Sequence, residues 1–233
     1  MNFMKNRKAG VSKTIQPVGV VARIFFPILF FITLSGCDKE TTYPQLSGKG
    51  MNLEHFIPGS WWKYEWNKVD GTTGEVTPMA SNDSVYVKGD TVINGNTYIH
   101  LTGTYFSGTP FHRILRDSLA FLVDQSGAIL FSLNPEPDTL KVAVSAEFTI
   151  HTITKKEAGE ITIPAGTFSD LYERQNHYYR TDGSNWACGT HWVAIQYLKE
   201  GVGILYERTA LLSELNTNCS YIERKLVAYY LAN

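Results

Sequence analysis

The chain of 233 residues contains three cysteines and six histidines, which are its most reactive side chains. Cys188 and His191 stand in a Cys-x-x-His spacing that could supply two ligands to a zinc ion. A structural zinc site takes four such ligands, and a catalytic site takes three and a water. The sequence shows no second cluster of ligands, so it predicts no metal and no cofactor.

The third cysteine, Cys37, ends the stretch Leu34-Ser35-Gly36-Cys37, which has the form of a bacterial lipobox. Residues 1–36 carry five basic and no acidic side chains. Their apolar run, residues 24–34, is shorter than the about 20 residues that a membrane helix needs, and Pro27 interrupts it. We therefore expect a cleaved signal peptide over residues 1–36 and lipidation of Cys37. An ordinary signal peptide with a cysteine near its cleavage site is the alternative.

Lipidation at Cys37 decides where the protein is expected to act. Two or three acyl chains on one residue attach a protein durably to a bilayer. The partners implied are the membrane itself and the machinery that processes and sorts lipoproteins. We expect a lipid-anchored protein of the bacterial cell envelope, on the outer membrane, with its periplasmic or surface orientation open.

Cys188 and Cys219 remain as a pair in a compartment that permits oxidation. A disulfide between them is the favoured interpretation. Metal binding by Cys188 with His191 is the alternative that the spacing leaves open.

No recognised catalytic motif is present in the sequence. The nucleophile elbow, phosphate loop, dinucleotide fingerprint, zinc protease and EF-hand patterns are all absent. The histidines are widely scattered: His55, His100, His112, His151, His177 and His191. The 22 acidic residues offer no distinguishable pair. We predict a protein that is not an enzyme and has no catalytic residues; the alternative is an envelope hydrolase whose site is assembled from distant His and acidic residues.

Aromatic side chains are the remaining candidates for binding. Six of them could stack on a sugar or line an apolar cavity: Trp61, Trp62, Tyr64, Trp66, Trp186 and Trp192. We interpret Trp62, Tyr64 and Trp66 as core residues because they alternate along one strand. Trp186, in a polar loop beside Cys188, is the better candidate for an exposed ligand-binding residue, together with Trp192. The expected ligand is a lipid or a glycan.

The composition of the mature chain indicates one β domain. Removing residues 1–36 changes the formal net charge from −1 to −6, which argues against a nucleic-acid partner. Abundant aromatic residues beside Val, Ile and Thr favour strands. We divide the chain into a flexible tether over residues 37–52 and a β domain over residues 53–233.

Turn residues locate several strands in that domain. Asn94-Gly95 lies between β-rich runs and predicts a hairpin with a type I′ turn. A second hairpin joins residues 118–123 to residues 128–133. Pro164 must end a strand or lie at an edge because it has no N–H to donate. Residues 209–215 form the one stretch that could be a short helix.

The order of these segments resembles a group of uncharacterised secreted lipoproteins of Bacteroidota. The resemblance rests on the Trp- and Tyr-rich first strand, the Asn-Gly hairpin, Ile163-Pro164-Ala165-Gly166-Thr167-Phe168, and Gly201-Val202-Gly203-Ile204 before a Tyr-rich last strand. It implies an all-β fold in which one antiparallel sheet is curled into an open or half barrel. It supplies no catalytic residues. The function expected is that of a non-enzymatic binding or scaffold protein on a lipid anchor.

Overall fold

The structure is a computed structural model that describes residues 50–157, 159–213 and 215–233. The predicted signal peptide, the lipidated Cys37 and most of the predicted tether lie outside the described residues. The first element is a single 3-10 turn, η1 (Leu53–His55). The remaining elements are strands: β1 (Trp61–Val69), β2 (Val76–Ile93), β3 (Asn96–Tyr105), β4 (Thr109–Ser118), β5 (Phe121–Asp124), β6 (Ile129–Ser132), β7 (Asp138–Val144), β8 (Phe148–Glu157), β9 (Ile161–Ile163), β10 (Gly166–Phe168), β11 (Leu171–Arg180), β12 (His191–Lys199), β13 (Gly203–Ala210) and β14 (Tyr221–Tyr230). In the described part of the chain, no helix has the length and apolar character needed to cross a membrane.

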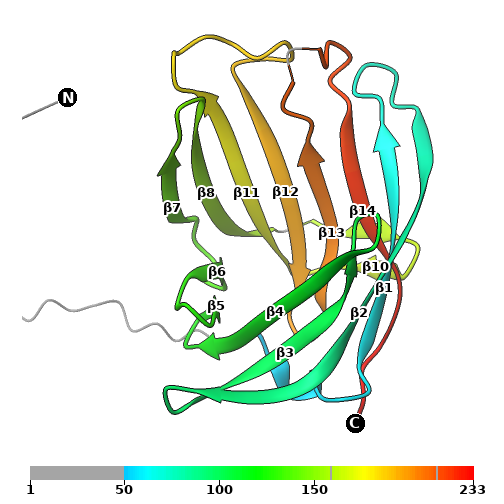
Figure 1. Cartoon of the computed structure of the whole chain (residues 1–233), viewed down its shortest axis with the longest axis vertical. Helices are drawn as coiled ribbons and strands as arrows, with labels where there is room; N and C mark the ends of the chain where they lie inside the picture. The colour runs from blue at the N-terminus through cyan, green and yellow to red at the C-terminus, as the bar shows by residue number, and fades with distance from the viewer. Residues whose placement is uncertain (1–49, 158, 214) are drawn as a thin grey trace, which may run out of the picture. The chain divides into compact units, whose positions relative to one another are not determined.

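Twelve of the strands form one antiparallel sheet, in the order β6-β5-β4-β3-β2-β1-β14-β13-β12-β11-β8-β7. The sequence prediction of a single curled antiparallel sheet is confirmed. The first and last strands pair in the middle of the sheet, and β6 and β7 form its two free edges. The linker between these edges is residues 133–137, which can span at most about 20 Å. The sheet must therefore curl until its edges approach, which leaves an open seam (Figure 1).

The local patterns in the sequence explain most of the strands. Trp62, Tyr64 and Trp66 alternate along β1, and all three are buried, as predicted. Asn94 and Gly95 have φ values of 50° and 78°, the positive values that a type I′ turn requires. The second predicted hairpin is present as β5 and β6.

Residues 209–213 and 215, the described part of the stretch that could be a short helix, are not helical. Thr209 and Ala210 instead complete β13, where they pair with Ile222 and Tyr221 of β14. Leu211, Leu212 and Ser213 have no regular structure. Pairing along β14 determines the conformation of Thr209 and Ala210 more strongly than their local helix propensity, which is a weak preference.

One end of the barrel is closed by the residues that precede β1. Met51 is buried; its N–H donates to Asp117 (3.0 Å) and its carbonyl accepts from the N–H of Gly201 (2.9 Å). Phe56 is also buried and packs on Trp62, with ring centroids 4.9 Å apart. Residues 50–52, which the sequence analysis places in the tether, thus contribute to the core.

Pro164 ends a strand, as predicted. Strand β9 stops at Ile163 and pairs only with β10, forming a separate two-stranded hairpin. This hairpin packs against the main sheet, where the N–H of Ala165 donates to the carbonyl of Leu226 (3.2 Å) and the ring of Phe168 lies 6.3 Å from that of Tyr229. Phe168 therefore packs against the core.

The opposite end of the barrel carries the disulfide between Cys188 and Cys219, whose Cα atoms are 5.5 Å apart. The bond joins the β11–β12 loop to the β13–β14 loop. The β1–β2 loop meets the second of these loops, because the hydroxyl of Thr72 donates to the carbonyl of Asn218 (3.2 Å). Both cysteines are consumed by the bond, so the alternative of a metal site at Cys188 is wrong.

Candidate functional site

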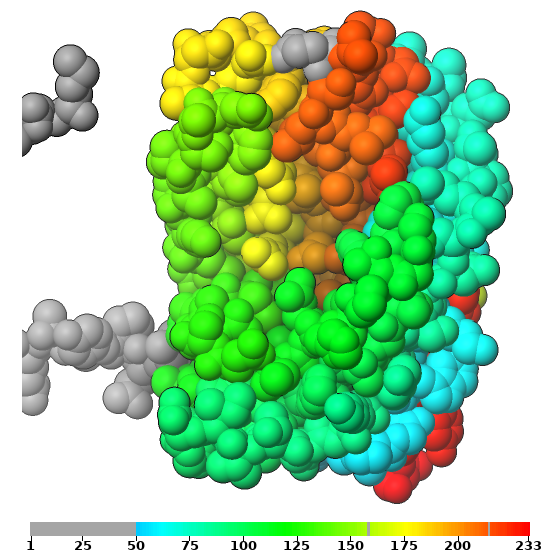
Figure 2. All heavy atoms as spheres, viewed as in Figure 1, coloured from blue at the N-terminus to red at the C-terminus, as the bar shows by residue number. Residues whose placement is uncertain are grey.

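The concave side of the sheet encloses a cavity of about 360 Å³, which we call the interior cavity. Its walls come from strands on both halves of the sheet, mainly β3 to β6 on one side and β11 to β14 on the other. Figure 2 shows the hollow between β4 (green) and β7 and β8 (yellow-green), with atoms of β11 and β12 (yellow to orange) at its floor. Ligand pockets of proteins commonly measure about 300–1,000 Å³, so this volume suits one small ligand.

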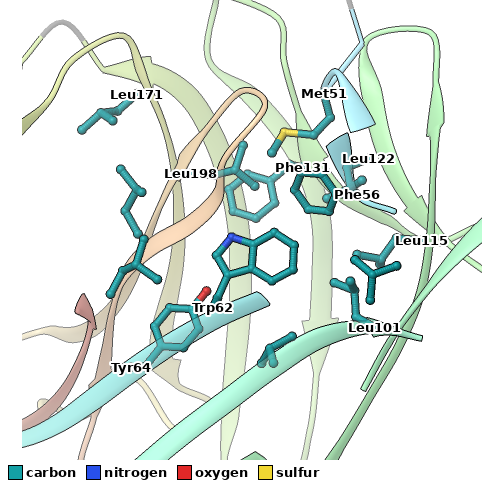
Figure 3. Close-up of a cluster of buried hydrophobic side chains, with 14 of the residues drawn as sticks. Met51, Phe56, Trp62, Tyr64, Leu101, Leu115, Leu122, Phe131, Leu171 and Leu198 are labelled. Atoms are coloured by element: carbon teal, nitrogen blue, oxygen red, sulfur yellow. The ribbon is translucent and has the colours of Figure 1, made fainter. Parts of the chain in front are cut away.

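One wall of the interior cavity is apolar. It is formed by Leu101, Phe111, Leu115, Leu122, Leu130 and Phe131. Behind this wall lies the core, where Trp62 packs among Met51, Phe56 and Leu198 (Figure 3). The indole N–H of Trp62 donates to the carbonyl of Val202 (2.7 Å), so this large side chain is fixed and its polar atom is satisfied.

The opposite wall is polar, because sheet register places four polar side chains in one row. Arg174 on β11, Gln196 on β12, Glu207 on β13 and Arg224 on β14 are successive cross-strand neighbours and line the cavity. Residues that face each other on adjacent strands point to the same side of a sheet. The row is therefore a product of register, which no local sequence pattern reveals.

Arg224 is buried and binds two acidic side chains, although its Nη2 has no hydrogen-bond partner among the described residues. Its Nε donates to Asp83 (2.9 Å) and its Nη1 donates to Glu207 (2.7 Å). The guanidinium also lies 3.6 Å from the ring centroid of Tyr64, a cation–π contact. Trp66 completes the network by donating its indole N–H to Asp83 (2.7 Å). Burial raises the pKa of Asp83, although Arg224 opposes this shift. We interpret the Asp83–Arg224–Glu207 network as structural.

Arg174 has no comparable partners. Its Nε–H is buried and donates to no acceptor among the described residues. Burial lowers its pKa, and the charge of Arg113 lowers it further. Arg113 lines the same cavity and lies 5.8 Å from the ring of Phe111. Two guanidinium groups thus face one cavity, and within the described residues neither forms a salt bridge with a carboxylate.

The predicted exposure of Trp186 is wrong, and Trp192, the second candidate for ligand binding, is buried as well. Their exposed fractions are 9% and 8%. The indole N–H of Trp186 donates to the carbonyl of Tyr178 (2.9 Å), and the guanidinium of Arg180 lies 5.2 Å from its ring centroid. Trp186 does border a second hollow of about 480 Å³ near the disulfide. With one face covered by Arg180 and little surface exposed, Trp186 does not form a flat platform for a sugar.

Three of the six histidines converge, which the sequence analysis did not predict. His151 on β8 and His177 on β11 are register partners, and the rings of His177 and His191 stack with centroids 5.1 Å apart. Tyr179 lies beside them, 4.9 Å from His191. Burial lowers the pKa of His177, and His191 and His151 lower it further. Within residues 50–157, 159–213 and 215–233, no group of three or more ligating side chains could hold a metal ion.

Among the residues that the structure describes, no carboxylate hydrogen-bonds directly to a histidine of this cluster. His177 hydrogen-bonds to Gln175 (2.7 Å), and Gln175 donates to Glu173 (2.8 Å). The carboxylate is thus one residue removed from the imidazole. Period-two spacing along β11 places Glu173, Gln175 and His177 on one face, but only the register with β8 and β12 brings the other histidines to them.

Comparisons with known proteins give no family assignment. No protein-family model matches the chain, and no curated protein matches it. Among solved structures, a protein of Bacteroides fragilis described as exported and as having a YmcC-like fold is similar, with 9% identity and a TM-score of 0.40 over 75% of this chain and 98% of that one. A protein of Parabacteroides distasonis described as a lipoprotein is similar with 13% identity and a TM-score of 0.36, over 75% of this chain and 98% of that one. No conclusion about this chain rests on either likeness.

Proposed function

We propose that the protein is a lipid-anchored component of the bacterial cell envelope that binds a small, largely apolar ligand in its interior cavity and does not catalyse a reaction. The observation that carries this proposal is the cavity itself, about 360 Å³ in volume and walled on one side by six large apolar side chains. A cavity that is filled by packed side chains would instead support a purely structural role.

The membrane anchor in this proposal rests on the lipobox at Cys37. A domain held at a membrane surface by acyl chains remains close to a pool of amphiphilic molecules. A binding cavity on such a domain would have a local source of ligand. The anchor and the cavity are separate features, so each can be tested without the other.

The arrangement of polar groups favours binding over hydrolysis. In the part of the chain that the structure describes, no histidine hydrogen-bonds to a carboxylate pair. Glu207, the carboxylate that lines the interior cavity, is committed to Arg224 and Gln196. The buried tryptophans likewise give no support to glycan stacking, so a lipid-like ligand is the better candidate.

The proposal is tested by narrowing the cavity without disturbing the core. Leu130→Trp adds bulk at a half-buried side chain that lines the cavity on the edge strand β6. Ile129→Trp is the matched control, because Ile129 is adjacent, 38% exposed and absent from the cavity wall. Binding is measured with an uncharged fluorescent apolar probe such as N-phenyl-1-naphthylamine, and folding is checked by thermal unfolding.

We expect the parent and Ile129→Trp to bind one equivalent of probe with similar affinity. We expect Leu130→Trp to bind at least about tenfold more weakly, a loss of about 1.4 kcal/mol. Unchanged affinity in Leu130→Trp, with an unchanged unfolding temperature, would contradict the proposal. Failure of the parent to bind the probe would do so as well.

A further inference from the structure

We propose that the ligand of the interior cavity is an amphiphile with a negatively charged oxygen-acid head group, which Arg174 binds with help from Arg113. This inference rests on the proposed function and specifies the chemical class of the ligand. It is carried by the position of these two side chains relative to the apolar wall.

Arg174 has a buried hydrogen-bond donor with no acceptor among the described residues. A guanidinium offers five N–H donors, and a buried donor without an acceptor destabilises the folded protein. The Nε of Arg174 is such a donor in the described part of the chain. Its neighbours in register, Thr154 and Gln196, are uncharged, and Gln196 is engaged with Glu207. Arg174 therefore has no anionic partner in the part of the protein that the structure describes, and its place in the cavity wall would let it bind an anion of the ligand.

The lining of the interior cavity has more cationic than anionic side chains. The lining contains three arginines, Arg113, Arg174 and Arg224, and one carboxylate, Glu207. Glu207 and the adjacent Asp83 both bind Arg224, so neither carboxylate is available to Arg174. With Asp83 included, the formal charge of these groups is +1; Arg113 is exposed and lies in the field of Asp124, whereas Arg174 forms no ion pair with a carboxylate among the described residues. The lower pKa of Arg174 is consistent with this, since burial and the charge of Arg113 both disfavour its protonated form.

Apolar side chains line the interior cavity beside these arginines. Phe111, Arg113 and Leu115 are two residues apart along β4 and point to the same face of the sheet. This strand therefore presents both apolar and cationic groups to the cavity. Leu122, Leu130 and Phe131 extend the apolar wall on β5 and β6. A ligand that fills this space would place its hydrocarbon part on these residues and its oxyanion on the guanidinium groups. Carboxylates and phosphates both match the geometry of a guanidinium.

The experiment compares three ligands with the same ten-carbon chain: decanoate, decyl phosphate and decanol. Binding to the intact parent domain is measured by calorimetry or by displacement of the apolar probe, below the micelle concentration of each compound. We expect at least one of the two anions to bind about tenfold or more tightly than decanol, because hydrogen bonds between charged groups are stronger than those made by a neutral hydroxyl. The ranking of decanoate and decyl phosphate identifies the head group.

Arg174→Gln should reduce the difference between the preferred anion and decanol to less than about threefold, and Arg174→Lys should retain part of it. Lys141→Gln, at an exposed position on β7, is the control that removes one positive charge away from the cavity. Raising the salt concentration should weaken binding of the anions only.

The outcomes separate this inference from the proposed function. Equal binding of all three ligands to the parent would overturn the inference while leaving the cavity as a binding site. Failure of all three to bind would overturn both. The comparison of the three ligands uses the parent protein. It therefore tests the inference even if Arg174→Gln fails to fold.

Discussion

Replacing the disulfide should cost a calculable amount of stability. Cys188 and Cys219 are separated by 31 residues. In the chain-entropy model, closing a loop of this size destabilises the unfolded state by about 3–4 kcal/mol. For a domain of this size, about 1 kcal/mol changes the midpoint of thermal unfolding by about 2–4 °C. The double variant Cys188→Ser/Cys219→Ser should therefore unfold roughly 6–16 °C below the parent.

The assay is thermal unfolding of the domain with and without a reducing agent. The parent should lose stability when reduced, and the double variant should not respond to the reductant. The single variant Cys188→Ser serves as a further control, because it leaves one free thiol. A double variant that unfolds within about 2 °C of the oxidised parent would refute the reasoning, since it would show that the bond does not restrict the unfolded chain as the entropy model requires.

Further predictions concern the core, the histidines and the anchor. Leu226→Ala should reduce the free energy of unfolding by about 2–5 kcal/mol, because the side chain of Leu226 is 0% exposed. The control Leu215→Ala, at a side chain that is 90% exposed, should change this free energy by less than about 0.5 kcal/mol. Denaturant titration measures both changes. The pKa of His177 is lowered in the folded state, so as the pH falls below about 6.5 the unfolded chain binds this proton before the folded protein does; the free energy of unfolding should therefore decrease as the pH falls. Unfolding measured between pH 5 and 8 should depend less on pH in His177→Gln than in the parent. Identical pH dependence in the two proteins would contradict the lowered pKa of His177. Cys37→Ala should move the domain from the membrane fraction to the aqueous fraction with its unfolding temperature unchanged, and continued membrane attachment would contradict the lipobox.

The strands could be predicted from the sequence where the determining contacts are local. The alternation of Trp62, Tyr64 and Trp66 identifies a half-buried strand without knowledge of its neighbours. Asn94-Gly95 selects its turn because two consecutive residues need positive φ. By contrast, Thr209 and Ala210 are held by pairing with β14, a strand more than ten residues later in the chain, and their local sequence gave the wrong structure.

The candidate site could not be predicted because it depends on register across the sheet. Arg174, Gln196 and Glu207 come from three strands, and a shift of one residue in any strand would turn its side chain to the other face. Register shifts within the sheet, such as that between Tyr197 and Leu198, are not visible in the sequence. Trp186 was misassigned for a related reason, because its polar loop folds back and buries the indole beneath Arg180.

The central claim is that the interior cavity holds a ligand. The most direct test is native mass spectrometry of the full chain purified from a bacterial envelope, followed by the same sample denatured. Covalent acyl chains remain in both spectra, so they do not interfere. We predict an additional mass in the native spectrum that disappears on denaturation and is absent from Leu130→Trp. Identical masses before and after denaturation, in the parent protein, would contradict the claim.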